Sequence, residues 1–173
     1  MHTPDPAKHV AGLLERDGGD LVLRDLDLAG IRLEDTDLSR AEISGCRLTA
    51  ATFVRVKFAS ARIHLSFLDR ATFEDCDFSG AIMQNSVFAG SRLLGCGFQD
   101  CEIVQVNFLG IQGTRVSFDH SNLYGSRFIG AVLALVSMRD CNLTRTFFDS
   151  PHREAVDFHS SNTAEAVFQE QPA

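Results

Sequence analysis

Cysteine and histidine are the residues of this sequence that could bind a metal or act as nucleophile and base. The cysteines have no paired spacing of the kind that zinc sites use; they are Cys46, Cys76, Cys96, Cys101 and Cys141. The six histidines are scattered, and no Ser-His-Asp set, phosphate loop or nucleotide motif occurs. We therefore expect no catalytic residues, no metal site and no cofactor.

The composition narrows the class of protein. The chain has 173 residues with a formal net charge of −7, and no apolar run approaches the ~20 residues of a membrane span. The first ten residues lack the apolar stretch of a secretory signal, and an odd number of unpaired cysteines is typical of a reduced compartment. We expect a cytoplasmic protein that binds neither membrane nor nucleic acid directly, since phosphate binding needs a basic surface.

Large apolar residues recur at every fifth position from Leu23 to Phe168. Of these 30 positions, 27 hold Leu, Ile, Phe or Met, and the exceptions are Gly113, Arg153 and Thr163. Small residues, including all five cysteines, occur two positions before a large one. Neither an α-helix nor a plain strand has a period of five. The chain must therefore turn regularly, with one large and one small side chain directed inwards on each five-residue side.

Segments such as AEISG CRLTA ATFVR VKFAS and ATFED CDFSG resemble the A(D/N)LXX consensus of the pentapeptide-repeat family. The resemblance extends over about residues 21–170. It implies an all-β fold, a right-handed quadrilateral parallel β-helix with four repeats in each coil of twenty residues. At the usual spacing of β-strands, about seven coils form a rod roughly 35 Å long.

A spacing of twenty residues also separates phenylalanine from the other large residues. One column of large residues is rich in phenylalanine: Leu38, Phe58, Phe78, Phe98, Phe118, Met138 and Phe158. Another column contains none: Leu23, Ile43, Ile63, Met83, Ile103, Leu123, Leu143 and Thr163. A five-residue repeat alone does not separate residues in this way. Stacked coils do, because like side chains then lie about 4.8 Å apart.

Charged residues follow the same spacing. Opposite charges often stand twenty residues apart, and no two like charges do so within residues 20–170. We expect Arg55 to lie between Asp35 and Asp75. Likewise, we expect Lys57 to lie between Asp37 and Asp77, which stand twenty positions before and after it.

The two ends of the predicted β-helix differ. Residues 1–19 are predicted to form a capping segment with a short helix, in which Val10, Leu13 and Leu14 share one face, and residues 20–170 form the repeats. The C-terminal end has no comparable cover, so apolar residues of the last coils are predicted to join two copies in a homodimer. These candidate interface residues are Phe158, Val167 and Phe168.

One segment departs from the repeat near the C-terminal end. An unpaired guanidinium is costly to bury, so the inward position of Arg153, close to a proline, predicts an outward bulge. The predicted bulge consists of Pro151, His152, Arg153 and Glu154.

Two outward surfaces are candidates for contact with a protein. The first is a mildly acidic face, formed by Asp37, Asp77, Asp100, Asp119, Asp140 and Asp157. The second is an apolar stripe, formed by Phe67, Val87, Leu109, Ile129 and Phe147. The acidic face has the alternative role of a solubilising surface, and an apolar stripe on a sheet can equally consist of scattered β-forming residues.

The family resemblance implies a function. The best-understood members of this family resemble short rods of B-DNA: they are dimers with acidic surfaces that occupy the DNA-binding saddle of type II topoisomerases and give resistance to quinolones or other gyrase poisons. We expect a non-catalytic DNA mimic that binds DNA gyrase or topoisomerase IV. The interleaved acids and bases depart from that pattern, so the alternative is a general protein-interaction scaffold without DNA mimicry.

Overall fold

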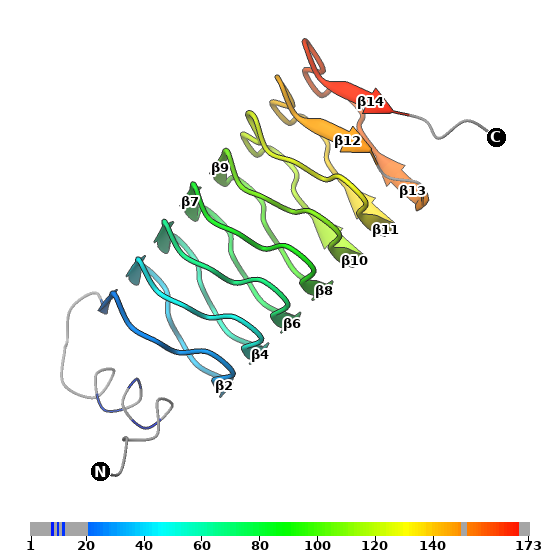
Figure 1. Ribbon diagram of the computed structural model, residues 1–173. Helices are drawn as coiled ribbons and strands as arrows, with labels where there is room; N and C mark the ends of the chain where they lie inside the picture. Colours follow the sequence, from blue (N-terminus) through cyan, green and yellow to red (C-terminus); the bar gives the residue numbers. More distant parts are fainter. Residues whose placement is uncertain (1–7, 9, 11, 13–20, 150–151, 170–173) are drawn as a thin grey trace.

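Short parallel strands stack into a rod in the computed structural model, which describes residues 8, 10, 12, 21–149 and 152–169 (Figure 1). The strands are β1 (Val22–Arg24), β2 (Arg32–Glu34), β3 (Glu42–Ser44), β4 (Thr52–Val54), β5 (Arg62–His64), β6 (Thr72–Glu74), β7 (Ile82–Gln84), β8 (Arg92–Leu94), β9 (Glu102–Val104), β10 (Gln112–Ser117), β11 (Val132–Ser137), β12 (Phe147–Asp149), β13 (His152–Asp157) and β14 (Val167–Gln169).

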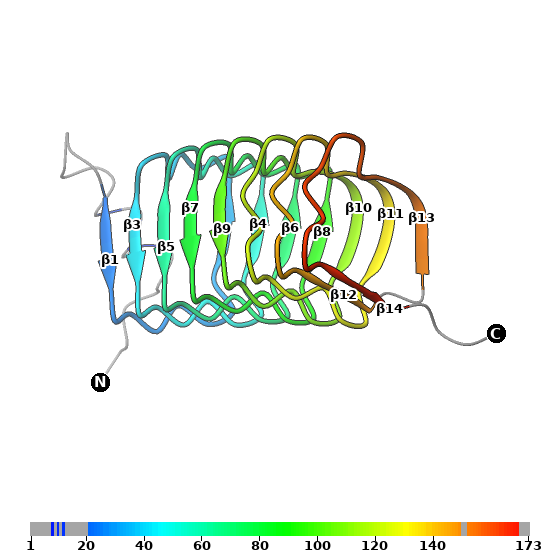
Figure 2. The same cartoon turned by 90° about the horizontal axis from the view of Figure 1, so that it is seen from above.

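The chain advances by one coil every twenty residues. Residue 22 pairs with residue 42, residue 42 with residue 62, and the same offset continues to the pairing of β12 with β14. The result is a parallel β-solenoid of about 7 turns, which confirms the predicted β-helix. Figure 2 shows the strands of successive coils side by side along the rod.

Each coil has four faces, which we name in chain order. Face A contains residues 21–25 and carries β1, β3, β5, β7 and β9; face C contains residues 31–35 and carries β2, β4, β6, β8, β10, β11 and β13. Face B contains residues 26–30, and face D contains residues 36–40. Faces B and D are joined mainly by isolated bridges between coils. The same names apply to the residues twenty, forty or more positions later.

The corners between faces have a left-handed backbone. Every described residue whose number is a multiple of five, from Asp25 to Glu165, has a positive φ, and twenty of these residues are not glycine. This conformation brings a Cβ atom close to the following carbonyl, which costs an L-residue roughly 1 kcal/mol relative to glycine. The coil-to-coil hydrogen bonds and the packed core hold these corners in place.

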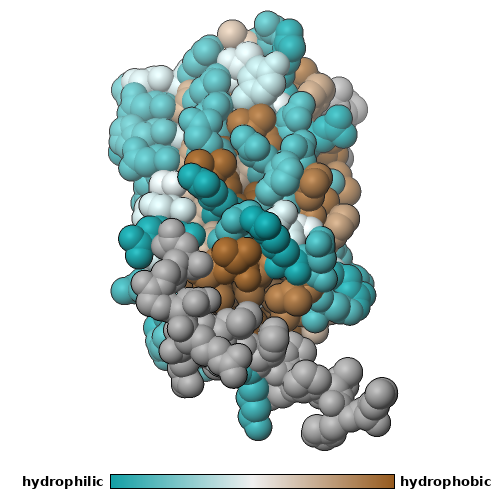
Figure 3. Space-filling model, turned by 90° about the vertical axis from the view of Figure 1, so that its left-hand side faces the viewer, coloured by the Kyte–Doolittle hydropathy of each residue, from teal (hydrophilic) through white to brown (hydrophobic). Residues whose placement is uncertain are grey.

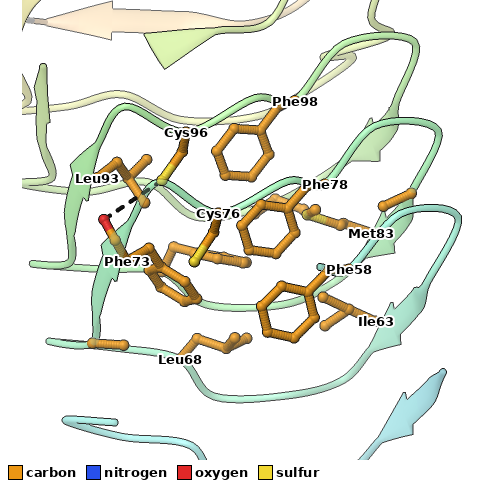
Figure 4. Packing of buried hydrophobic residues seen from close by; sticks show 14 of the residues in the cluster. Phe58, Ile63, Leu68, Phe73, Cys76, Phe78, Met83, Leu93, Cys96 and Phe98 are labelled. Carbon is orange, nitrogen blue, oxygen red and sulfur yellow. Dashed lines mark hydrogen bonds between the residues drawn. The ribbon is translucent and has the colours of Figure 1, made fainter. Parts of the chain in front are cut away.

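The interior is filled by stacked side chains. The rings of Phe58, Phe78 and Phe98 stack at centroid distances of 4.6 and 4.4 Å, and Phe118 continues the stack at 4.9 Å (Figure 4). All four rings lie on face D and are fully buried. This arrangement confirms the column of phenylalanines that the twenty-residue spacing predicts.

Gly113 occupies an inward position where the repeat calls for a large side chain. The backbone keeps its register there, since Gly113 pairs with Leu93 and Leu133. The Cδ2 atom of Leu133 lies 3.1 Å from the point where a Cβ of residue 113 would stand. The next coil therefore supplies the apolar atoms that the glycine lacks.

The N-terminal segment is described at three residues only. Lys8, Val10 and Gly12 have a helical backbone, and Val10 is fully buried and belongs to the core cluster. Leu13 and Leu14 lie outside the described residues. The complete capping helix therefore remains a prediction.

The predicted bulge near the C-terminus is corrected by the structure. His152, Arg153 and Glu154 belong to β13 and pair in register with β11, and Pro151 lies outside the described residues. Arg153 takes the inward position of the last full coil, where its guanidinium carbon lies 5.7 Å from the centroid of the Phe168 ring. Arg153 is half-buried, so the charge keeps contact with solvent without a bulge.

Candidate protein-binding surfaces

The cysteine side chains point into the rod. All five are buried free thiols, and the sulfur of Cys101 lies 2.9 Å from the carbonyl oxygen of Phe78. Burial raises the pKa of Cys101 to about 12 and that of Cys141 to about 11. The thiols of Cys101 and Cys141 are therefore protonated at neutral pH, where they fill space and donate to backbone carbonyls.

The polar residues of the described ranges form no grouping of a kind that holds a metal ion. Within those ranges, no cluster of three His, Cys, Asp or Glu side chains occurs. His120 Nδ1 lies 3.8 Å from Asp140 Oδ2, and both side chains are exposed. The same residues contain no helix that is long and apolar enough to cross a membrane.

The six carboxylates of the predicted acidic face lie on one side of the rod. Asp37, Asp77 and Asp157 share one column of face D, in which residues 37, 57 and 77 are bridged through their backbones. Asp119 stands on the same face, and Asp100 and Asp140 occupy the corner between faces D and A, with φ of 57° and 53°. The structure therefore brings these carboxylates together on a single face.

Four of these carboxylates also accept hydrogen bonds that shape the turns. Asp37 and Asp77 each accept the backbone N–H two residues later, at 2.9 Å. Asp157 accepts the N–H of His159 and, at 2.6 Å, the Nε–H of Arg139. Asp119 accepts the N–H of Arg139 at 2.8 Å and a short hydrogen bond from Ser137. Their positions are therefore fixed by local structure.

These contacts change the acidity of the carboxyls. The hydrogen bonds from Ser39 lower the pKa of Asp37, and those from His159 and Arg139 lower the pKa of Asp157. Partial burial would raise the pKa of Asp119, but the hydrogen bonds of Ser137 and Arg139 outweigh it, and the pKa is lowered. Asp37, Asp119 and Asp157 therefore stay ionised in mildly acidic solution.

We expect the stability of the rod to fall in acid. Asp37, Asp119 and Asp157 have lower pKa values in the folded chain than in the unfolded one, where aspartate titrates near ~3.9. Their contribution to stability is present above about pH 4 and is lost as the pH falls through the lowered values. Thermal melting followed by circular dichroism should give a midpoint that is level near neutrality and falls below about pH 4. Asp157→Asn should flatten this fall, and a midpoint that rises on acidification would contradict the assignment.

The predicted ladder of alternating charges is only partly formed. Arg55 pairs with Asp35, with Nε and Oδ1 2.6 Å apart, and also with Glu34 at 2.6 Å. Asp75 does not complete the expected trio, since its Oδ1 lies toward the next coil, in the space that a Cβ of Gly95 would need. The backbone of Lys57 forms β-bridges with Asp37 in the preceding coil and Asp77 in the next. The carboxylates of Asp37 and Asp77, however, accept hydrogen bonds from backbone N–H groups instead of pairing with the Lys57 ammonium.

The acidic excess is concentrated on face D. Face D with its two corners carries eight carboxylates and five cations, an excess of three negative charges with histidines neutral. Face A with the corner it shares with face B carries four carboxylates and three cations. Among the described residues, acids and bases balance, three each, both on face C and on face B with its following corner. A basic partner would therefore be attracted to face D.

The predicted apolar stripe follows face B along the rod. Phe67, Leu109 and Phe147 are 51%, 45% and 41% exposed, whereas Val87 and Ile129 are half-buried. Phe67 and Val87 are bridged neighbours, and the guanidinium carbon of Arg127 lies 6.0 Å from the centroid of the Phe147 ring. Figure 3 looks onto the left-hand side of Figure 1, where β7 and β9 of face A lie. It shows hydrophobic side chains in small groups among hydrophilic ones.

A further apolar group was not found by sequence reasoning. Leu94, Val132 and Leu135 are 38%, 43% and 58% exposed on face C and its corner with face D. Leu135 has a φ of 56°, and Leu65 has a φ of 48° at the opposite corner of the coil. The signal in the sequence is that leucine occupies a corner position, where polar residues and glycine otherwise predominate.

Comparison with known proteins identifies relatives of this chain. The family model described as pentapeptide repeats matches residues 20–54, 37–75, 71–110 and 114–149. The quinolone resistance pentapeptide repeat protein QnrB96 of Scandinavium goeteborgense is 26% identical over 115 residues, which cover 60% of this chain and 54% of that protein. The chain thus spans about half the length of this relative.

Two solved structures are also similar to this chain. Full-length QnrB1, a plasmid-mediated fluoroquinolone resistance protein, is 17% identical, with coverage of 82% of this chain and 91% of that chain and a TM-score of 0.36. HetL, involved in heterocyst differentiation regulation in the cyanobacterium Nostoc, is 14% identical, with coverage of 96% and 94% and a TM-score of 0.31. Because the family model matches well over half of the residues, the chain belongs to the pentapeptide repeat family.

Proposed function

We propose that this protein is a non-catalytic DNA mimic that binds a bacterial type II topoisomerase, DNA gyrase or topoisomerase IV, and reduces the effect of quinolones on it. The observation that carries this proposal is the concentration of negative charge on face D of a narrow, regular rod. A surface that binds DNA is basic, because it neutralises phosphates. Such a surface would attract face D at long range.

The relative from Scandinavium supports the same proposal, since it is named for quinolone resistance. Four of the six carboxylates on this side of the rod are also held in fixed positions by backbone and side-chain donors. A preorganised row of charges loses less entropy on binding than mobile side chains do. Face D therefore has both the sign and the rigidity that the proposed role requires.

A gyrase supercoiling assay in the presence of a quinolone tests this function. We expect the protein to restore supercoiling, and the double variant Asp100→Asn/Asp140→Asn to restore it less. Both positions are corners, where asparagine accepts a positive φ, so the fold should persist. The matched control is Asp25→Asn/Asp149→Asn, which removes two charges from faces A and B and should behave like the natural protein. No effect of the natural protein on gyrase would refute the proposal.

We also propose that two copies join through their C-terminal coils. Within the described residues, β13 and β14 each pair on one side only. Phe158 is half-buried, and Phe168 is 39% exposed although it stacks on Phe148 at 5.0 Å. An unpaired sheet edge with apolar residues is a template for another chain, and a two-fold pair satisfies it without further growth. Such a dimer would double the length of the acidic face.

The second candidate function is a protein-interaction scaffold that uses the apolar stripe of face B. The exposed rings of Phe67 and Phe147 favour it, because aromatic side chains at the surface often anchor interfaces. In the assay above, this scaffold would leave gyrase unaffected. Substitution of Phe67 should then abolish binding to the scaffold's own partner.

A further inference from the structure

Leu135 combines the left-handed backbone of a corner with a highly exposed apolar side chain. It is 58% exposed, the highest value among the large apolar residues of the described chain, and its φ is 56°. A branched side chain in the left-handed region is strained, and an exposed leucine side chain gains nothing from burial. The backbone strain and the lack of burial both disfavour leucine at this position in the isolated protein. A contact that buries this side chain would offset them.

Apolar side chains near Leu135 form a surface in two parts, which we call the leucine edge: Leu94, Val132, Ala134 and Leu135. Thr114 links its two parts, since it pairs with Leu94 in one coil and with Ala134 in the next. Beside Leu94 lies an open hollow of about 220 Å³ over face C. The edge thus offers a projecting side chain at one end and a recess at the other.

Charged residues of both signs lie around the leucine edge. Glu74 and Asp75 precede it along the rod and Glu154 follows it, and none of the three forms an ion pair with a residue of the described ranges. Arg92 lies on the same strand as Leu94 and lines the hollow, and Arg115 lies in the intervening coil. Leu135 also borders the acidic face D, since Ser137, two residues later, donates to Asp119. A partner that is complementary to face D and to the edge therefore has a basic surface beside an apolar pocket.

We propose that the leucine edge is the apolar part of the surface that binds the topoisomerase, with the Leu135 side chain inserted into that partner. This inference rests on the proposed function and extends it from face D to the corner with face C. Charge on face D attracts the basic partner from a distance, whereas a buried leucine slows its release. Binding should then contain a component that salt does not screen, unlike a purely ionic contact.

Leu135→Gly tests this role, with Leu65→Gly as the matched control. Glycine adopts a positive φ without strain, so both variants should melt at or above the temperature of the natural protein. Leu65 is 54% exposed and has the same left-handed conformation, but it stands on the corner between faces A and B. The pair therefore differs in location and matches in chemistry.

The measurement is the affinity of each full-length protein for purified DNA gyrase at low and at high salt. We expect Leu135→Gly to weaken binding about tenfold at both salt concentrations, and Leu65→Gly to bind like the natural protein. If the natural protein binds and Leu135→Gly binds equally well, the leucine edge is not an interface. If Leu65→Gly alone weakens binding, the interface includes face B instead. If the natural protein does not bind gyrase, the proposed function fails and this inference fails with it.

Discussion

Phe98→Ala should lower the free energy of unfolding by roughly 3–5 kcal/mol, the range for truncation of a buried phenylalanine. Phe98 is fully buried between the rings of Phe78 and Phe118, at centroid distances of 4.4 and 4.9 Å. Removal of the ring leaves a cavity, and the coils on either side cannot close it without breaking their register. Thermal and urea unfolding should both show the loss.

Gln99→Ala is the control for Phe98→Ala. Gln99 follows Phe98 directly but points outwards and is half-buried, so its truncation should change stability by less than about 0.5 kcal/mol. Phe98→Leu should fall between the two variants, because it keeps an apolar side chain in the stack. Equal losses for Phe98→Ala and Gln99→Ala would contradict the assignment of inward and outward positions.

Phe168→Asp should convert the proposed dimer into a monomer. The natural chain should scatter light as a particle of twice 19.0 kDa, and the variant as one chain. The reason is that Phe168 is 39% exposed at the open C-terminal end, where a partner would bury it. A buried carboxylate without a matched partner costs more than the contact contributes.

Phe67→Asp serves as the control for the dimer experiment. Phe67 is also an exposed phenylalanine, but it lies on face B in the middle of the rod, far from the C-terminal end. This variant should remain dimeric if the C-terminal coils form the contact. A natural protein that is monomeric at tens of micromolar would end the dimer proposal, and it would shorten the available acidic face to roughly 35 Å.

The repeat made most of the fold predictable. The inward position of every fifth residue, the coil of twenty residues and the stacking of Phe58, Phe78, Phe98 and Phe118 follow from spacing alone. These features depend on burial and on coil-to-coil hydrogen bonds, which repeat identically along the chain. The leucine in place of phenylalanine at position 93, and the glycine at position 113, are absorbed without a change of register.

The errors arose where one residue has several competing partners. Arg55 was expected to share its charge between two carboxylates, but Glu34 in the preceding coil also accepts from it, and Asp75 turns toward Gly95 instead. Arg153 was expected to break the coil, because burial of a lone charge is costly. At the last full coil, a charged inward residue keeps access to solvent and lies over Phe168. Sequence spacing does not encode such end effects.

The surface was harder to predict than the core. The twenty-residue spacing predicts that the carboxylates lie on one face. The hydrogen bonds of Asp37 with Ser39 and of Asp119 with Ser137 depend on turn geometry, which the spacing does not predict. Leu135 stands at a corner, so the spacing of apolar residues along the flat faces does not indicate it. Its significance depends on its exposure and its left-handed backbone, which only the coordinates provide.

Because the register is strictly twenty residues, the length of the rod can change only by whole coils. Loss or duplication of one whole coil would change the length by about 4.8 Å and leave every column of side chains aligned. A change of ten residues would instead place face A over face C, so that unlike side chains would meet throughout the core. Insertions and deletions that preserve the core can therefore change the length of the rod only in steps of one coil.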